Sequence, residues 1–223
     1  MQIIDNGLVD YEYADTLQRK LVSEKKKNPL QEDYLIFSEF NHVITLGRNV
    51  NESHILVSRH KLENLGIRVL KIDRGGDVTY HGPGQFVIYP IIDLKRQVKD
   101  IRKYIRNLEQ WVIDFLAKYN LEGYRVEDKT GVWVQDKKIA SIGIGISGWI
   151  TYHGIGLNIS SNLDYFDFIV PCGIKDKKMT SLKELTGKDV SMEEVKKRIS
   201  KIGSLRGAEG DAAILGNKIE GEK

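Results

Sequence analysis

The fold is decided by residues 138–159, which read KIASIGIGISGWITYHGIGLNI. Residues 138–146 and residues 149–159 both have the apolar, β-branched composition that is typical of strands. Between them, Ser147-Gly148 occupies the position of a tight turn, because glycine readily adopts the positive φ that two-residue hairpin loops require. We therefore predict a β-hairpin over this stretch.

The same stretch also matches the dinucleotide-binding pattern G-x-G-x-x-G. Gly143, Gly145 and Gly148 supply the glycines, and Asp164 lies near the distance at which a ribose-binding acid is sought. That pattern requires a helix beginning at its third glycine, whereas the residues after Gly148 have strand composition and too many glycines for a helix. A dinucleotide site is therefore disfavoured, and the glycines instead indicate a sheet surface that a ligand approaches closely.

The segments on either side carry alternating helix and strand patterns. Helical spacing of apolar residues predicts helices at residues 10–27, 53–65 and 99–119, and Ser191 with Glu194 forms a capping box that starts a last helix. Strand patterns cover residues 34–37, 43–46, 67–72, 86–92, 124–126 and 131–134. We expect residues 39–42 to be the turn of a hairpin between the first two strands.

Helices interspersed with hairpins, without strict βαβ alternation, indicate an α+β fold. We expect a two-layer, mixed and largely antiparallel sheet with flanking helices. Residues 1–202 are expected to form a single domain. Residues 203–223, which show little periodicity, are expected to be a loosely ordered C-terminal tail.

Composition narrows the function classes. The chain has 223 residues, a net charge of +3 and 41% hydrophobic residues, which is ordinary for a globular domain and gives no argument for nucleic-acid binding. No window is apolar enough for a membrane span, and the N-terminus lacks a secretory signal, so we expect a soluble, cytoplasmic protein. A single cysteine excludes an internal disulfide and any zinc site that needs several thiolates, and no metal site is expected.

A glycine-rich segment precedes the strand at residues 86–92. Residues 74–85 read RGGDVTYHGPGQ and contain four of the 21 glycines of the chain. Such a density of glycine, bounded by strand patterns on both sides, indicates a shaped loop and not a linker.

The one cysteine, Cys172, follows an apolar run in the turn Pro171-Cys172-Gly173. A lone cysteine is most often a buried, inert thiol. Here the turn tends to present the side chain, and nearby lysines (Lys175, Lys177 and Lys178) favour the thiolate form. The residues alone leave both interpretations open.

A reactive thiol needs a basic or cationic neighbour. His42, His54 and His60 lie in stretches without another chemical signal, while His81 and His153 each precede a glycine and could line a pocket. Lys138 begins an apolar strand, where burial would lower the pKa of its ammonium group, or where it serves as a strand-edge charge against aggregation. Local sequence does not separate these two roles for Lys138.

Four blocks together resemble the lipoyl(octanoyl) transferase family, in that family's order. They are Arg74-Gly75-Gly76-x-x-Thr79-Tyr80-His81-Gly82-Pro83-Gly84-Gln85, Gly131 to Val134 with Lys138-Ile139-Ala140-x-Ile142-Gly143, His153-Gly154-x-x-Leu157-Asn158, and Pro171 to Ile174 followed by Thr180-Ser181-Leu182. The resemblance covers roughly residues 10 to 200. It implies a fold like that of biotin and lipoate protein ligases.

The resemblance also implies roles for individual residues. Cys172 would be the acyl-thioester nucleophile, and Lys138 would lower the pKa of the Cys172 thiol and shuttle protons. The substrate-binding residues would be Arg74, Gly75, Gly76, Asp77, Val78, Thr79, Tyr80, His81, Ser141, Ile142, Gly143, Gly154, Ile155 and Gly156. We expect an apolar groove for the acyl chain lined by residues such as Val78, Ile142 and Ile144.

The activity implied is transfer of an octanoyl group from octanoyl-acyl carrier protein to a lysine of a lipoyl domain. The acceptors would be the lipoyl domains of 2-oxoacid dehydrogenase complexes and the glycine cleavage H protein. No cofactor is expected, and neither nucleic acid nor a membrane is an expected partner. The main alternative is an ATP-dependent lipoate or biotin protein ligase of the same fold, and a thiol hydrolase is a further enzymatic alternative. A non-catalytic binder of acyl chains or of the carrier protein is the alternative from another class.

Overall fold

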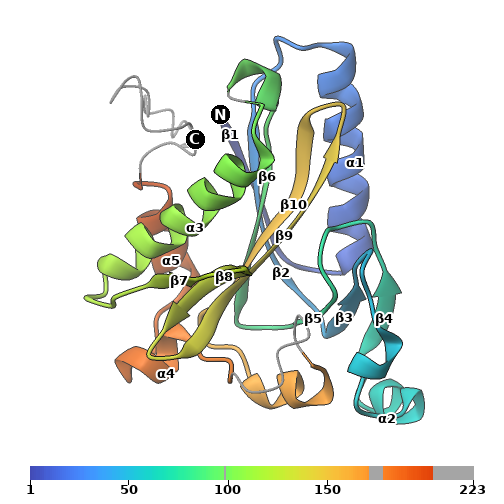
Figure 1. Cartoon of the computed structure of the whole chain (residues 1–223), viewed down its shortest axis with the longest axis vertical. Coiled ribbons are helices and arrows are strands. Elements are labelled where there is room, and N and C mark those ends of the chain that lie inside the picture. The colour runs from blue at the N-terminus through green and yellow to red at the C-terminus, as the bar shows by residue number, and fades with distance from the viewer. Residues whose placement is uncertain (98, 171–177, 203–223) are drawn as a thin grey trace, which may run out of the picture.

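The structure is a computed structural model that describes residues 1–97, 99–170 and 178–202. Its larger sheet has the order β1-β2-β6-β10-β9-β8-β7 (Figure 1). These strands are β1 (Gln2–Val9), β2 (Tyr34–Phe40), β6 (Gln85–Ile91), β10 (Ile150–Asn158), β9 (Lys137–Ser147), β8 (Lys129–Val134) and β7 (Tyr124–Val126). Every neighbouring pair is antiparallel except β1 with β2, which confirms the predicted mixed, largely antiparallel sheet.

Helices cover both faces of this sheet. Leu35 and Phe37 of β2 pack in one core cluster with α3 (Ile101–Ala117), the predicted amphipathic helix, and with α5 (Met192–Ile199). The alternate β2 residues Tyr34 and Ile36 pack in a second cluster with α1 (Tyr11–Lys27). Because successive strand residues point to opposite faces, α1 lies on one side and α3 and α5 lie on the other.

A second, three-stranded sheet stands at one end of the larger one. Its order is β4 (Arg68–Lys71), β3 (Val43–Leu46) and β5 (Val78–His81). It packs with α2 (Arg59–Asn64) and the 3₁₀ segment η3 (Leu163–Phe168) around a third apolar cluster. The remaining short elements are η1 (Glu52–His54), η2 (Leu94–Arg96) and α4 (Leu182–Thr186). None of the described helices is long and apolar enough to cross a membrane.

The hairpin predicted over residues 138–159 is confirmed, with a shift of one residue in its turn. Ser147 is the last residue of β9 and pairs with Ile150, so the two turn residues are Gly148 and Trp149. Both have positive φ, 65° and 71°, as the two-residue hairpin turn requires. Because β10 follows Gly148, the glycines here do not begin a dinucleotide-binding helix.

The hairpin predicted across residues 39–42 is wrong. β2 runs to Phe40 and is paired on both edges, with β1 on one side and β6 on the other. β3 therefore finds no free edge on β2, and it pairs with β4 and β5 in the second sheet instead. The local sequence pattern predicted where the strands lie. Which strand pairs with which was decided by the strand edges that are available in the folded protein.

The helix predicted over residues 53–65 is broken in the middle. It divides into η1 and α2, and Ser58 caps α2 by accepting from the Lys61 N–H at 3.2 Å. Between them, the Leu56 N–H donates to the Phe168 carbonyl at 2.8 Å, and Ile55 forms a bridge with Ile169. Backbone pairing with a distant segment therefore replaces the helical hydrogen bonds.

Candidate active site

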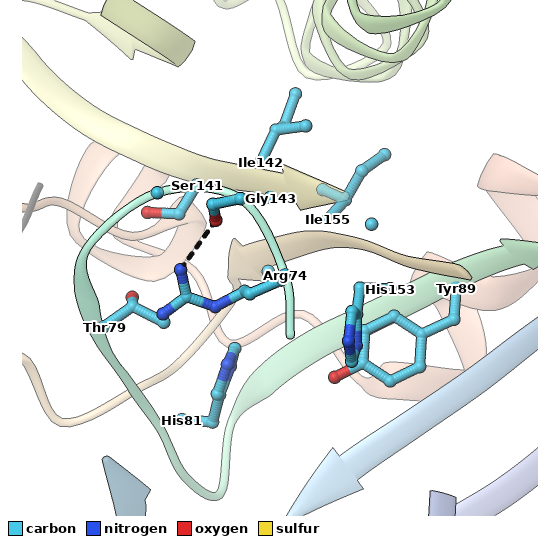
Figure 2. Close-up of a pocket in the computed structure, with 13 residues that line it drawn as sticks. Arg74, Thr79, His81, Tyr89, Ser141, Ile142, Gly143, His153 and Ile155 are labelled. Atoms are coloured by element: carbon cyan, nitrogen blue, oxygen red, sulfur yellow. Dashed lines mark hydrogen bonds between the residues drawn. The ribbon is translucent and has the colours of Figure 1, made fainter. Parts of the chain in front are cut away.

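A pocket lies between the larger sheet and the loop that follows β4, and Figure 2 shows its labelled side chains. Its wall comes from that loop and from β5, β6, β9 and β10. The lining residues are Arg74, Gly75, Gly76, Thr79, His81, Tyr89, Ser141, Ile142, Gly143, His153, Gly154, Ile155 and Gly156. Three glycine-rich segments that are far apart in the sequence thus meet at one site.

Most residues expected to contact substrate line this pocket, and Asp77, Val78 and Tyr80 do not. Val78 and Tyr80 point into the third apolar cluster, because alternate residues of β5 face away from Thr79 and His81. Asp77 accepts from the Asn51 N–H at 3.1 Å and contacts His54 Nδ1.

Of the three residues expected to line the acyl groove, the structure places one in the pocket. Ile142 is among the lining residues, while Val78 lies in the third cluster and Ile144 packs against the core cluster that contains α3.

Glycine at position 143 is needed because the loop after β4 crosses β9 closely. The Gly75 N–H donates to the Ile144 carbonyl at 2.8 Å. A Cβ at Gly143 would lie 3.0 Å from both Arg74 Cδ and the Gly75 carbonyl oxygen. A side chain there would push the loop away from the strand, so this glycine sets the depth of the pocket wall.

Arg74 stands at the centre of the site in Figure 2. Its side chain is buried, and Nη2 donates to the Thr45 carbonyl and hydroxyl at 2.9 and 3.0 Å. Nη1 donates to the Gly75 carbonyl at 3.0 Å. These bonds hold a guanidinium against the wall of the pocket, where its fixed positive charge favours electron-rich ligand atoms.

His81 lies in the same wall, as the sequence suggested. Burial lowers its pKa to about 4, although a hydrogen bond with Gln85 acts in the opposite direction. His81 Nδ1 lies 2.6 Å from Gln85 Oε1. Near neutral pH this imidazole is therefore uncharged.

His153 lies at another part of the wall, beside Tyr89, with their ring centroids 5.8 Å apart. Burial lowers the pKa of His153. Its Nε2 lies 3.1 Å from Asp73 Oδ1, and Tyr11 Oη lies 3.4 Å from its Nδ1. Although burial raises the pKa of Asp73, hydrogen bonds to its carboxylate hold that pKa well below its usual range.

The backbone of His153 is strained. Its φ is 56°, in the left-handed region that costs a non-glycine residue of the order of 1 kcal/mol or more. The Gln18 side chain of α1 accepts from the His153 N–H at 2.6 Å and fixes this conformation. Sequence reasoning placed His153 near a pocket but missed Tyr89, which had no signal beyond its place in an apolar strand.

Lys138 is buried, with its Nζ 5.1 Å from the centroid of the Trp133 ring. Gly131 makes room for it, since a Cβ there would lie 2.6 Å from Lys138 Cε. The Lys138 N–H donates to the Lys178 carbonyl at 3.0 Å, and its carbonyl accepts from the Thr180 N–H at 2.9 Å. Burial between neighbouring segments does not fit the interpretation of Lys138 as an exposed strand-edge charge.

Cys172 lies outside the described residues, as do Lys175 and Lys177 of the neighbouring lysine cluster. The described residues on either side of this segment are both paired. The Val170 N–H donates to the His54 carbonyl at 2.8 Å, and the Lys178 carbonyl accepts from Lys138. Within the described ranges, no group of three or more His, Cys, Asp or Glu side chains could hold a metal ion.

The sequence is similar to that of known octanoyltransferases. The octanoyltransferase of Solibacter usitatus is 45% identical over 195 residues, which cover 87% of each chain. That of Caldicellulosiruptor saccharolyticus is 44% identical over 204 residues, covering 90% of this chain and 86% of the relative. Identities at this level over nearly the whole length indicate one family.

The fold is similar to those of protein ligases. A bipartite lipoate protein ligase from Thermoplasma acidophilum superposes with a TM-score of 0.68 at 17% identity, covering 90% of this chain and 82% of that one. Biotin protein ligase from Aquifex aeolicus gives 0.51 at 19% identity, covering 90% and 69%. These likenesses confirm the expected ligase-like fold.

The profile of the lipoyl protein ligase A/B catalytic domain matches residues 10–202, a range that contains every pocket residue and Lys138. With this match and with relatives above 40% identity, the chain belongs to the lipoyl protein ligase A/B catalytic-domain family and groups with its octanoyltransferases.

Proposed function

We propose that this protein transfers an octanoyl group from octanoyl-acyl carrier protein to a lysine of a lipoyl domain, through a thioester on Cys172. The family makes it an acyltransferase of lipoate biosynthesis. The acceptors in this proposal are the lipoyl domains of 2-oxoacid dehydrogenase complexes and the glycine cleavage H protein, and the reaction takes place in the cytoplasm.

The observation that carries the proposal is the pairing of Lys138 with Lys178 and Thr180. In the sequence, Cys172 lies between Val170 and Lys178. The Val170 N–H is hydrogen-bonded to the His54 carbonyl. Because Cys172 lies close to Lys178 in the sequence, the pairing of Lys178 with Lys138 favours an encounter between the thiol and Lys138. An ammonium group beside a thiol stabilises the thiolate, which is the attacking form.

In the first step, the Cys172 thiolate attacks the thioester carbonyl of octanoyl-carrier protein. A bond forms between Cys172 Sγ and the acyl carbon, and the carbon–sulfur bond to the carrier breaks. The carrier thiolate takes a proton from the Lys138 ammonium group and leaves as a thiol. Exchange of one thioester for another is close to balanced, so this step requires no ATP.

In the second step, the ε-amine of the acceptor lysine attacks the octanoyl-enzyme. A carbon–nitrogen bond forms, the bond to Cys172 breaks, and the thiolate is restored. Lys138, neutral after the first step, takes the proton that the nitrogen loses. Formation of an amide from a thioester is downhill, so the transfer runs toward octanoylated protein.

The acyl chain occupies the described pocket in this proposal. Burying seven carbons beyond the carbonyl contributes on the order of 5 kcal/mol, at about 0.8 kcal/mol for each carbon. Ile142 and Ile155 supply apolar wall, and the glycines of β9 and β10 leave room for the chain. Water has little access to a chain held against two strands, which favours transfer over hydrolysis.

Mass spectrometry after mixing with octanoyl-carrier protein tests the proposal. We expect an octanoyl adduct on the wild-type chain and none on Cys172→Ser. We also expect Lys138→Ala to reduce transfer by a factor of about 100 or more, the usual contribution of a positioned proton-transfer group.

An adduct that persists in Cys172→Ser, or a near-normal rate for Lys138→Ala, would contradict the proposal. Incubation with ATP and free octanoate separates it from a ligase activity, because the transferase requires the carrier thioester. Lys137, which is paired with Glu184 at 2.5 Å on the surface, provides a matched control in Lys137→Ala.

A further inference from the structure

A buried chain of hydrogen bonds joins the pocket wall to the backbone of Lys138. It starts at His81, whose Nδ1 lies 2.6 Å from Gln85 Oε1, and continues from Gln85 Nε2 to Asn158 Oδ1 at 2.9 Å. Asn158 Nδ2 donates to the Thr180 carbonyl at 3.0 Å, and the Thr180 N–H donates to the Lys138 carbonyl at 2.9 Å. All five residues are buried, so water does not compete for these bonds.

Backbone carbonyls determine the direction of every bond in this chain. Because a carbonyl oxygen only accepts, the Asn158 group that faces Thr180 must be its NH₂, and Oδ1 faces Gln85. Gln85 Nε2 donates to that oxygen and also to the Tyr80 carbonyl at 3.3 Å. Gln85 therefore presents its oxygen to His81. It follows that Nδ1 of His81 carries the proton.

This tautomer makes Nε2 of His81 a hydrogen-bond acceptor. A neutral imidazole has one N–H, which is already used on Gln85. In the described part of the chain, the His81 ring is hydrogen-bonded through Nδ1. An acceptor in a pocket wall is costly to bury without a donor, so it suits a ligand that brings an N–H or O–H group.

His81 lies toward the Lys138 end of the pocket. A Cβ on Gly156 would lie 3.5 Å from His81 Cε1, so His81 lies beside Gly156. Gly156 pairs with Ser141, which lies close to Lys138 on β9. His153 pairs with Ile144, farther along the same strand. Along these strands, His81 therefore lies nearer Lys138 and His153 lies farther from it. We call these two positions the His81 end and the His153 end of the pocket.

In the second step of the proposed transfer, after the carrier thiol has left, the acceptor lysine brings a new donor to the Lys138 end. This donor is its ε-amine, whereas the octanoyl chain has none. We propose that His81 Nε2 accepts a hydrogen bond from this amine and directs its lone pair at the acyl carbonyl. Gln85 and Asn158 are positioning residues that hold the imidazole in the accepting tautomer. This inference rests on the proposed function and adds the group that receives the acceptor substrate.

Separate measurement of the two half-reactions tests this role. Release of carrier thiol reports formation of the octanoyl-enzyme, and modification of an added lipoyl domain reports transfer. For His81→Leu we expect transfer to slow by about tenfold, as for loss of one hydrogen bond of about 1.4 kcal/mol, and carrier release to slow several-fold less than transfer. His81→Gln, whose Oε1 can accept, should recover part of the loss.

The exposed His60, which contacts Asn64, supplies the control His60→Gln, and thermal unfolding of each variant checks that it folds. Equal slowing of both half-reactions in His81→Leu would overturn the assignment, because His81 would then act on the thiol. Normal transfer in a folded His81→Leu would overturn it as well. If wild type forms no adduct at Cys172, the proposed function fails instead, so the two failures are distinguishable.

A pH profile tests the positioning role of Gln85. The titratable groups that face His81 are Tyr11, Arg74 and His153. Gln85→Glu adds a carboxylate at Nδ1, which raises the pKa of His81 and makes Nε2 a donor at low pH. We expect the transfer rate of this variant to fall several-fold more at pH 6 than at pH 8. A loss that is equal at both values would indicate a structural role only and would overturn the assignment.

Discussion

The two ends of the pocket carry the same residue in opposite hydrogen-bonding states. At one end, His81 is held by neutral amides, with Nδ1 protonated toward Gln85 and Nε2 available as an acceptor. At the other end, His153 faces the carboxylate of Asp73 through Nε2 and the hydroxyl of Tyr11 through Nδ1. Each histidine precedes a glycine in the sequence, so the difference arises from their partners and not from local pattern.

Hydrogen-bond partners give the two imidazoles different roles. A carboxylate only accepts, so the ionised Asp73 requires the proton of His153 to sit on Nε2. Both ring nitrogens of His153 are then engaged, which makes it a fixed part of the wall. His81 keeps one nitrogen for a ligand because its amide partners use only the other.

Strand β10 runs past both ends of the pocket, so a substitution in it should have the largest effect. A Cβ at Gly154 would overlap the Ile88 carbonyl and lie 2.8 Å from Pro90 Cδ. We expect Gly154→Ala to lower the free energy of unfolding by about 3 kcal/mol and to disturb both ends together. Chemical denaturation measures this loss.

Gly75→Ala is the matched control, because a Cβ there meets only the Ile144 carbonyl at 3.5 Å. It should cost well under about 1 kcal/mol. Equal destabilisation by the two variants would show that the close approach of Ile88 and Pro90 to Gly154 is not what makes a side chain unfavourable there.

The pH dependence of stability reports the protonation state of His81. The unfolded pKa is about 6.5 and the folded pKa is about 4, so the unfolded state binds more protons between these values. His81 therefore lowers stability as pH falls through this window, by about 1 kcal/mol for each pH unit. His81→Gln should remove this contribution, as measured by denaturation at pH 7 and pH 5.

His60→Gln, an exposed substitution, should leave the slope unchanged in the same measurement. An unaltered slope in His81→Gln would mean that the imidazole is not held neutral by burial.

The smallest effect is expected where the His153 end reaches the surface. Arg19 donates to Asp73 at 3.1 Å, but its side chain is 51% exposed, so screening by solvent limits its contribution. We expect Arg19→Met to cost about 0.5 kcal/mol or less, since Tyr152 still donates to Asp73 at 2.8 Å. A loss above about 2 kcal/mol in thermal or chemical unfolding would show that the charge of Arg19 is needed to hold His153.

Much of the fold was predictable because its signals are local. The strand composition of residues 138–159 and the apolar faces of α1 and α3 predict elements that the structure contains. Where pairing is non-local, prediction failed. Residues 55 and 56 adopt backbone pairing with residues 169 and 168. The local sequence around residues 53–65 carries no sign of these distant partners.

The candidate site divides in the same way. The glycine-rich segments predicted most of the pocket wall, because a close approach of backbone to backbone requires glycine and so is visible in the composition. Tyr89 and Asp73 carried no such signature, since their places depend on which strands neighbour β6 and β10. The roles of Cys172 and Lys138 stay predictions, drawn from the family resemblance.

By itself, then, the sequence determined the elements with strong periodicity, the glycine-rich segments and the one thiol available for chemistry. Tertiary structure alone decided that β3 leaves β2 for a second sheet, that Lys138 pairs with Lys178, and that His81 and His153 carry their protons on different nitrogens. The physical reason is that periodicity and composition act over a few neighbouring residues. Strand edges, burial and the direction of hydrogen bonds are settled only by groups that meet from distant parts of the chain.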